Sequence, residues 1–283
     1  MRIAVIGLGN MGKVVAAALA RDGREVIGWN RTVREAPAGV TLAPDLSTAV
    51  DKAELLLLVS STYDSTYDML RPVEGRLAGK TLVNFNCGLP QEAETFAAWA
   101  TAAGARWDDA AIMAYPLDIG SDRALFLHAC EPSLFAEIAP LLAPLGQRHR
   151  LAGSAPGACK VLFNVLIARN YAWMMSYLQA AAIARASGVD TTVFTDIAMD
   201  LLGPLFGNIQ RAKAEIAAGD FGPAKLAALA VHHQAAAAAL EMATEVGART
   251  PILTAVVGAM QQGIDAGLGD REIAACFTSF LPR

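Results

Sequence analysis

The chain opens with the stretch Met1-Arg2-Ile3-Ala4-Val5-Ile6-Gly7-Leu8-Gly9-Asn10-Met11-Gly12, and an alanine-rich helical pattern follows over residues 13–21. A short apolar strand thus runs into a G-x-G-x-x-G turn at the start of a helix. In such a turn the first glycine permits a sharp bend, the second lets a pyrophosphate approach, and the third allows close packing of helix and strand. The free N–H groups and partial positive charge of the helix N-terminus favour that phosphate. The stretch therefore predicts a dinucleotide-binding turn made by Gly7, Leu8, Gly9, Asn10, Met11 and Gly12.

The second predicted strand, residues 25–29, ends at Asn30-Arg31-Thr32, and Arg34 lies two residues further on. NAD-specific sites usually carry Asp or Glu at this strand end, where the carboxylate accepts hydrogen bonds from the ribose hydroxyls. A carboxylate would repel a 2′-phosphate, whereas a guanidinium binds one with paired, charge-assisted hydrogen bonds. Solvated loop charges are the alternative interpretation. The sequence predicts NADP(H) as the coenzyme, with its 2′-phosphate near Asn30, Arg31, Thr32 and Arg34.

The composition is typical of a globular protein and gives no sign of a nucleic-acid partner. The 283 residues are 54% hydrophobic and 18% charged, with a formal net charge of −4 and no basic run. Four cysteines without C-x-x-C spacing and four histidines without metal-ligand spacing predict reduced thiols and no metal site in a cytoplasmic protein. The longest apolar segment, residues 161–184, includes Arg169 and two asparagines, which argues against a membrane span.

Strand-like and helical patterns alternate through the first half of the chain. Strands are expected over residues 2–6, 25–29, 55–59, 80–86, 105–113, 124–129 and 147–151. Helices are expected over residues 11–21, 45–51, 64–77, 91–103 and 132–143. This alternation predicts an α/β fold, a Rossmann-type doubly wound and mostly parallel sheet with helices on both faces.

The pattern changes near Gly153, and beyond Pro156 only helical periodicity remains. We therefore expect a dinucleotide-binding domain over residues 1–155 and an all-helical substrate and dimerisation domain over 156–283. One long helix over about 157–187 is expected to begin the second domain. Alanine-rich segments leave this half too little polar surface for an isolated bundle, which predicts a homodimer through the helical domain.

Lys160 and Asn164 lie four residues apart on the predicted long helix, and Tyr171 returns to the same face. Ligands of open α/β sheets bind beyond the carboxyl ends of the strands, so this stripe is expected to face the crevice that holds the nicotinamide. A lysine shielded from water can transfer a proton near neutral pH. The sequence predicts Lys160, Asn164 and Tyr171 as catalytic residues. In the alternative interpretation, Lys160 is a solvated charge on the helix and Asn164 makes a polar contact between helices.

Three segments, residues 7–12, 30–32 and 157–164, together resemble the β-hydroxyacid dehydrogenase superfamily, which is related to 6-phosphogluconate dehydrogenase. The resemblance implies a Rossmann domain, a long interdomain helix and a helical dimerisation domain. Members carry a G-x-x-x-K-x-x-x-N element, and this chain keeps the Lys-x-x-x-Asn spacing with Gly157 one residue closer to the lysine. In that family the lysine is the acid/base and the asparagine orients the substrate, which implies these roles for Lys160 and Asn164.

The substrate half of the chain resembles the imine reductase and reductive aminase branch instead. The dehydrogenase motif Asp-x-Pro-Val-Ser-Gly-Gly is missing, and residues 109–120 read D-A-A-I-M-A-Y-P-L-D-I-G, which is similar to that branch. The segments N-F-N-C-G-L-P at 84–90 and A-G-L-G-D at 266–270 also resemble it. The resemblance implies hydride transfer from NADPH to the C=N bond of a cyclic imine or iminium ion. The implied substrate pocket includes Met113, Tyr115 and Asp118.

Further coenzyme contacts are expected where two other predicted strands end. Ser60 and Ser61 follow the strand at 55–59, at an edge where hydroxyl and backbone groups approach a coenzyme, although a plain loop is the alternative. Asn86 and Cys87 lie in the segment 84–90 that resembles the imine reductases, and we expect them to contact the coenzyme as well.

The two resemblances imply different chemistry at the reacting bond. Imine reductases usually carry an aspartate or tyrosine near the position of the dehydrogenase lysine, where this chain has Lys160 or, in a shifted alignment, Phe163. With Phe163 there, Tyr171, Tyr115 or Asp118 is left as proton donor. An iminium ion needs no strong acid, whereas a carbonyl needs a proton at the developing alkoxide. The sequence thus predicts an NADPH-dependent imine reductase. The alternatives are a 3-hydroxyisobutyrate-like or alcohol dehydrogenase that uses Lys160 as its acid/base, and a non-catalytic NADP(H) sensor.

Overall fold

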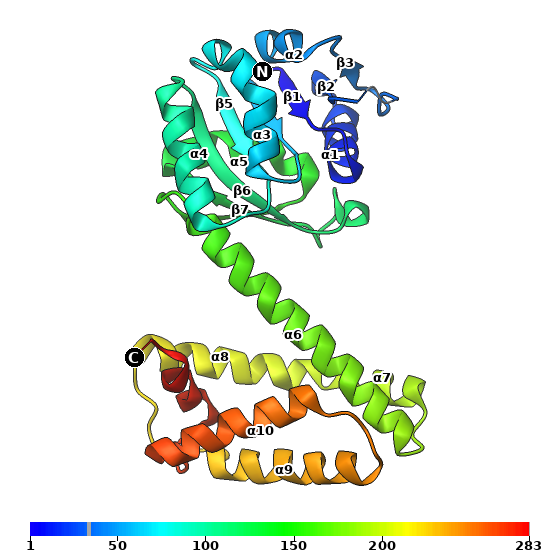
Figure 1. Ribbon diagram of the computed structural model, residues 1–283, viewed down its shortest axis with the longest axis vertical. Helices are drawn as coiled ribbons and strands as arrows, with labels where there is room; N and C mark the ends of the chain where they lie inside the picture. The colour runs from blue at the N-terminus through cyan, green and yellow to red at the C-terminus, as the bar shows by residue number, and fades with distance from the viewer. Residues whose placement is uncertain (33–34, 283) are drawn as a thin grey trace. The chain divides into compact units, whose positions relative to one another are not determined.

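The computed structural model describes residues 1–32 and 35–282 (Figure 1). The chain forms two compact units that divide between Ala168 and Arg169, inside a single long helix. The first unit is α/β, and the regular elements of the second are helical in the described residues. The domain limits given above, 1–155 and 156–283, remain predictions. Arg34, one of the residues expected near the 2′-phosphate, lies outside the described residues.

The described part of the first unit contains one sheet of eight strands. In chain order the strands are β1 (Ile3–Ile6), β2 (Val26–Trp29), β3 (Thr41–Leu42), β4 (Leu55–Leu58), β5 (Thr81–Asn84), β6 (Arg106–Met113), β7 (Leu125–Ala129) and β8 (Arg148–Gly153). Their spatial order is β3-β2-β1-β4-β5-β6-β7-β8, and neighbours are parallel except for β6 and β7. The strand order reverses between β1 and β4, which places the expected ligand crevice at their carboxyl ends.

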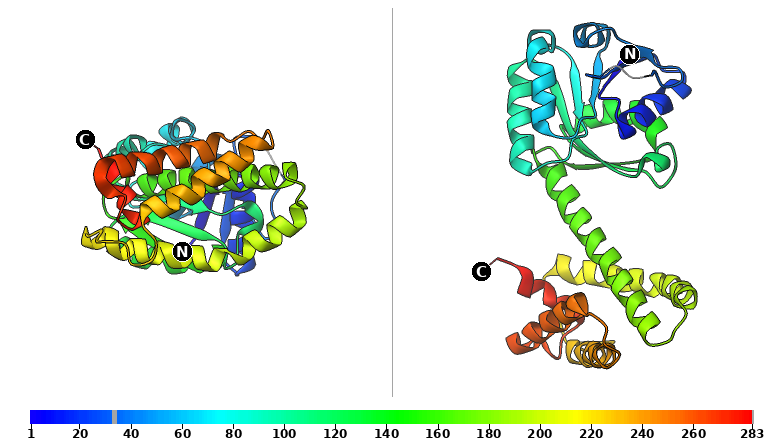
Figure 2. Two further views of the ribbon diagram at one scale, coloured as in Figure 1. Left: turned by 90° about the horizontal axis from the view of Figure 1, so that it is seen from below. Right: turned by 45° about the vertical axis from the view of Figure 1, so that its right-hand side comes forward.

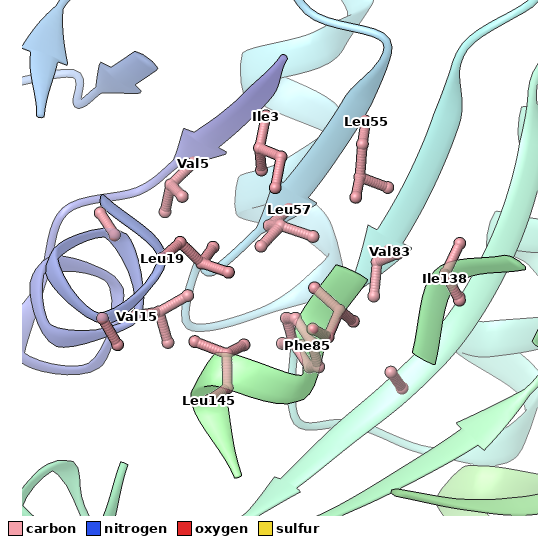
Figure 3. Close-up of a cluster of buried hydrophobic side chains, with 14 of the residues drawn as sticks. Ile3, Val5, Val15, Leu19, Leu55, Leu57, Val83, Phe85, Ile138 and Leu145 are labelled. Carbon is pink, nitrogen blue, oxygen red and sulfur yellow. The ribbon is translucent and has the colours of Figure 1, made fainter. Parts of the chain in front are cut away.

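Helices cover both faces of this sheet. They are α1 (Asn10–Arg21), α2 (Leu46–Lys52), α3 (Tyr63–Leu70), α4 (Pro90–Ala102) and α5 (Pro132–Leu142). Because side chains alternate along a strand, Ile3 and Val5 of β1 pack with α1 and α5, whereas Ala4 and Ile6 pack with α2, α3 and α4. Figure 3 shows the first of these cores, where Leu19 of α1 points toward the strands.

The predicted α/β class is confirmed, and the predicted strands agree with the structure to within two residues. Two differences have local causes. The edge strand β3 has two exposed residues, too few to produce a readable alternation. The helix expected over 64–77 ends as an α-helix at Leu70, and a 3-10 helix covers Arg71–Arg76. Pro72 causes this change because it cannot donate the hydrogen bond of an α-helix.

The long helix is confirmed as α6 (Ala158–Ala186), and four shorter helices follow in the second unit. They are α7 (Thr191–Asp200), α8 (Leu202–Ala218), α9 (Leu229–Glu245) and α10 (Pro251–Gly263), followed by a π-helical turn over Ile264–Leu268 and a 3-10 segment over Ile273–Phe280. The helices α9 and α10 lie side by side (Figures 1 and 2). No helix among the described residues has the length and apolar character needed to cross a membrane.

A hydrogen-bond chain joins β6, β7 and β8 at the far edge of the sheet. His128 Nδ1 lies 2.6 Å from Asp108 Oδ2, and His128 Nε2 lies 2.9 Å from His149 Nδ1. The His149 ring stacks on Phe126 with 4.8 Å between ring centroids. Burial, and then the neighbouring His128, lower the pKa of His149 to about 4. The fold therefore favours the neutral form of His149.

This cluster predicts a specific loss of stability in mild acid. Between pH 6.5 and about 4 the unfolded chain binds a proton at His149 that the folded chain does not, so the free energy of unfolding falls as the pH drops through this window. We expect urea denaturation to show that the free energy of unfolding falls more between pH 7 and pH 5 for the native chain than for His149→Phe. This variant keeps the stack on Phe126. Equal losses in the two proteins would contradict the assignment.

Candidate functional site

The glycine turn after β1 has the geometry that its sequence predicts. Gly7 has a φ of 102°, and a Cβ there would lie 2.4 Å from the carbonyl oxygen of Val59. A Cβ on Gly12 would lie 1.8 Å from the carbonyl oxygen of Gly7. At Gly9, in contrast, a Cβ would meet no atom within 4 Å among the described residues. Gly7 and Gly12 thus permit close backbone packing, whereas Gly9 borders open space.

The N-terminus of α1 at this turn suits an anionic group. Gly9 is the N-cap, and no side chain of the described residues caps the helix there. The first turn carries no acidic residue. The helix therefore presents uncompensated N–H groups and a positive dipole end beside the space at Gly9. Since a pyrophosphate needs both features, the turn fits the predicted dinucleotide.

A groove with a volume of about 260 Å³ extends from this turn toward the end of β2. Its lining includes Asn30, Arg31 and Thr32 from the turn after β2, and Ser60 and Ser61 from the loop after β4. Arg31 and Thr32 are exposed and available to a ligand. Asn30 instead bonds within the protein: Oδ1 accepts from the Leu8 N–H at 2.9 Å, and Nδ2 donates to the Thr32 carbonyl at 2.7 Å.

A second asparagine holds together the loops that follow β4 and β5. Asn86 Oδ1 accepts from the Ser60 N–H at 3.1 Å and from Ser60 Oγ at 3.0 Å. Asn86 Nδ2 donates to the Thr62 carbonyl at 3.0 Å and to Thr66 Oγ1 at 2.5 Å. The side chain is buried, and these bonds occupy its whole donor and acceptor capacity. Ser61 lines the groove, and the exposed Cys87 lines a neighbouring pocket.

A neighbouring pocket of about 370 Å³ continues from the glycine turn toward the start of α6. Gly12, Ser61 and Cys87 line its polar end. Its apolar wall is formed by Val59, Phe85, Ala111, Ile112, Ala114 and Phe163. None of the described residues that line it carries a carboxylate or an ammonium group. The pocket therefore offers an uncharged, largely apolar surface next to the predicted coenzyme site.

Lys160 lies beneath this pocket rather than in it. Its side chain is completely buried, and Nζ lies 3.1 Å from Asp109 Oδ1 and donates to the Ala110 carbonyl at 2.8 Å. Tyr63 donates its phenol proton to the same carboxylate at 2.5 Å. Burial, and then the charge of Asp109, raise the pKa of Tyr63, so the phenol stays protonated as a donor. The expectation that Lys160 faces the crevice is therefore corrected, because Asp109 on β6 holds its ammonium group in the interior.

The other two predicted catalytic residues have surroundings that differ from those of Lys160. Asn164 Nδ2 donates to the Gly88 carbonyl at 3.0 Å, on the loop between β5 and α4. Tyr171 belongs to the second unit and is exposed. On α6 it is Phe163, from the shifted alignment, that lines the pocket.

The three residues expected in the substrate pocket are not among the residues that line this pocket. Ala111, Ile112 and Ala114 line the pocket, whereas Met113 is not in the lining and packs against the apolar cluster of Ala111, Leu127, Ala129 and Cys159. Tyr115 is exposed. Asp118 is bound by Arg123, whose Nε lies 2.6 Å from Asp118 Oδ1.

Sequence reasoning missed Tyr63, Asn84 and Asp109, which form a buried polar cluster with Lys160. Asn84 Nδ2 donates to Asp109 Oδ1 at 3.3 Å. A carboxylate in the middle of a buried strand is a signal that could have been used, because such a charge requires a partner. No local pattern identifies that partner as a lysine 51 positions later.

Comparison with known proteins shows the family of this chain. A model of the NAD-binding domain of 6-phosphogluconate dehydrogenase matches residues 2–157, and a model of the C-terminal domain of NADPH-dependent reductive aminase-like proteins matches residues 156–281. The NADPH-dependent reductive aminase of Aspergillus oryzae is 31% identical over 228 residues, which are 77% of each protein. The chain belongs to the reductive aminase-like family of oxidoreductases. The resemblance stated from the sequence is thereby confirmed.

Solved structures of this family are similar over the whole chain. The imine reductase from Myxococcus stipitatus in complex with NADP+ is 27% identical, with a TM-score of 0.89 and coverage of 100% of both chains. The reductive aminase from Aspergillus terreus in complex with NADPH and ethyl levulinate is 25% identical, with a TM-score of 0.88 and coverage of 99% of both chains.

The buried position of Lys160 predicts a large structural effect of its removal. Lys160→Met leaves the Asp109 carboxylate without its counter-ion, and we expect a loss of about 3–5 kcal/mol in the free energy of unfolding. The double variant Asp109→Asn/Lys160→Met removes both charges and should be more stable than Lys160→Met alone. Urea denaturation measures both, with the exposed Lys52→Met as a control that should change little. A Lys160→Met protein as stable as the control would contradict this role.

Proposed function

We propose that the protein is an NADPH-dependent imine reductase that transfers a hydride to the C=N bond of cyclic imines or iminium ions. The observation that carries this proposal is the continuity of the glycine-turn groove with an uncharged, largely apolar pocket. When bound, the reduced nicotinamide supplies the hydride. The named activities and bound coenzymes of the related reductive aminase and imine reductases support the proposal.

The residues of the first unit divide the task of holding the coenzyme. The turn over 7–12 and the N-terminus of α1 bind the pyrophosphate through N–H groups. Arg31 and Thr32, at the end of β2, would bind the 2′-phosphate, and Ser60 and Ser61 would contact the coenzyme from the loop after β4. Cys87 and Phe163 line the pocket that would receive the substrate beside the coenzyme.

The uncharged pocket favours imine chemistry over the alternative dehydrogenase. Reduction of a carbonyl needs proton delivery to an alkoxide, and the predicted acid, Lys160, is already bonded to Asp109 and to the Ala110 carbonyl. An iminium ion carries its own positive charge and accepts a hydride without that proton. Asn164 would then position the loop at Gly88, and Tyr171 is proposed as the proton donor for neutral imines.

We also propose a homodimer formed through the helical unit. Among the described residues of this unit, the buried apolar side chains are only Ile183, Leu229, Ala243 and Ala275, while many apolar side chains on α6, α7 and α8 are exposed. A second copy would cover these faces. Light scattering at micromolar concentration should give twice the monomer mass, and a monomeric mass would contradict the dimer.

All four cysteines are free thiols, which suits a cytoplasmic enzyme.

The activity itself is tested with a simple cyclic imine. We expect oxidation of NADPH, followed by its absorbance, in the presence of 1-pyrroline, and little reduction of NADP+ by 3-hydroxy acids. Lys160→Met protein that remains folded should retain imine reduction, because the lysine is not the acid. Activity with 3-hydroxy acids alone would favour the dehydrogenase, and tight NADPH binding without either activity would favour a sensor.

Arg31 is expected to determine the preference for the phosphorylated coenzyme. Arg31→Ala should weaken NADPH binding by about 2 kcal/mol, the size of a lost charge-assisted contact, with little effect on NADH. Fluorescence titration of both coenzymes measures this difference. Equal losses for the two coenzymes would refute the position of the 2′-phosphate.

A further inference from the structure

Asn30 links the two turns that form one end of the coenzyme groove. Its Oδ1 accepts the N–H of Leu8, in the turn after β1, and its Nδ2 donates to the carbonyl of Thr32, in the turn after β2. The distances, 2.9 and 2.7 Å, are those of well-formed hydrogen bonds. Both polar atoms of the amide are therefore used by the backbone of the protein itself.

We propose that Asn30 is a positioning residue, which holds the glycine turn against the turn at Arg31 and Thr32, and that recognition of the 2′-phosphate is left to Arg31 and Thr32. This inference rests on the proposed use of NADP(H). A groove whose two walls are fixed in advance loses less conformational freedom when a ligand binds. The asparagine thus increases affinity without being a ligand.

The chemistry of the amide explains why this position is not an aspartate. A carboxylate could accept the Leu8 N–H but has no proton to donate to the Thr32 carbonyl. Its charge would also stand beside the phosphate that Arg31 is expected to bind. An amide combines a donor and an acceptor in one uncharged group, so it joins the turns and leaves the groove free of negative charge.

The positioning role and a ligand role predict different coenzyme profiles. NADPH and NADH share the pyrophosphate that lies at the glycine turn, so loosening that turn affects both. The 2′-phosphate is present in NADPH alone, so loss of a phosphate ligand affects NADPH alone. Arg31→Ala serves as the matched comparison, because Arg31 is the adjacent exposed residue of the same groove.

The first experiment titrates native protein, Asn30→Ala and Arg31→Ala with NADPH and with NADH. We expect Asn30→Ala to weaken both coenzymes by a similar factor, about tenfold for two hydrogen bonds of ordinary strength, and to leave the ratio of the two affinities unchanged. Arg31→Ala should lower the ratio of the NADPH affinity to the NADH affinity. The proposal is overturned if Asn30→Ala weakens NADPH alone or weakens neither coenzyme.

The second experiment needs no coenzyme, so it separates this inference from the proposed function. Hydrogen exchange of the Leu8 amide should be faster in Asn30→Ala than in native protein and unchanged in Arg31→Ala. Asn30→Asp keeps the acceptor for Leu8 and should restore slow exchange. If Asn30→Ala does not fold, Asn30→Val, which also lacks the acceptor, takes its place. Equal exchange in native protein and both Asn30 variants would overturn the inference, whereas native protein that binds neither coenzyme would instead refute the proposed function.

Discussion

The close approach of three backbone segments at Gly7 is the constraint on which the groove depends. Gly7 meets the end of β4 at Val59 and the first turn of α1 at Gly12, at distances that exclude a side chain. The strand, the helix and the neighbouring loop are consequently fixed relative to one another by contacts between backbone atoms. The start of α1, which no side chain of the described residues caps, then borders open space at Gly9.

Uncharged amide side chains join the loops at the carboxyl ends of the strands. Asn30 joins the turns after β1 and β2, and Asn86 joins the loops after β4 and β5. A carboxylate could accept the same N–H groups, but it would add negative charge where an anionic coenzyme is expected and could not donate to a carbonyl. Amide side chains thus provide rigidity at the strand ends while the electrostatics of the groove are left to the helix terminus and Arg31.

The features that could be predicted from the sequence are those with local causes. The turn at 7–12 and the strands are determined by steric limits and by alternation over a few residues, and both match the structure. The orientation of Lys160 could not be predicted in this way. Helical periodicity places Lys160 and Asn164 on related faces, but a partner on β6, Asp109, decides which face turns inward. That pairing spans 51 positions and depends on how α6 meets the sheet.

The buried ion pair with Asp109 gives the lysine of the Lys-x-x-x-Asn element a structural role in this chain. With its ammonium group bonded to Asp109 and to the Ala110 carbonyl, Lys160 fixes the first turn of α6 on β6. Phe163, three residues later, then lies at the pocket, about one helical turn from the lysine. The lysine of this turn thus holds the helix on the sheet, and the residue of the same turn that lines the pocket is apolar. The same turn of helix therefore supports a pocket suited to a substrate that brings its own charge.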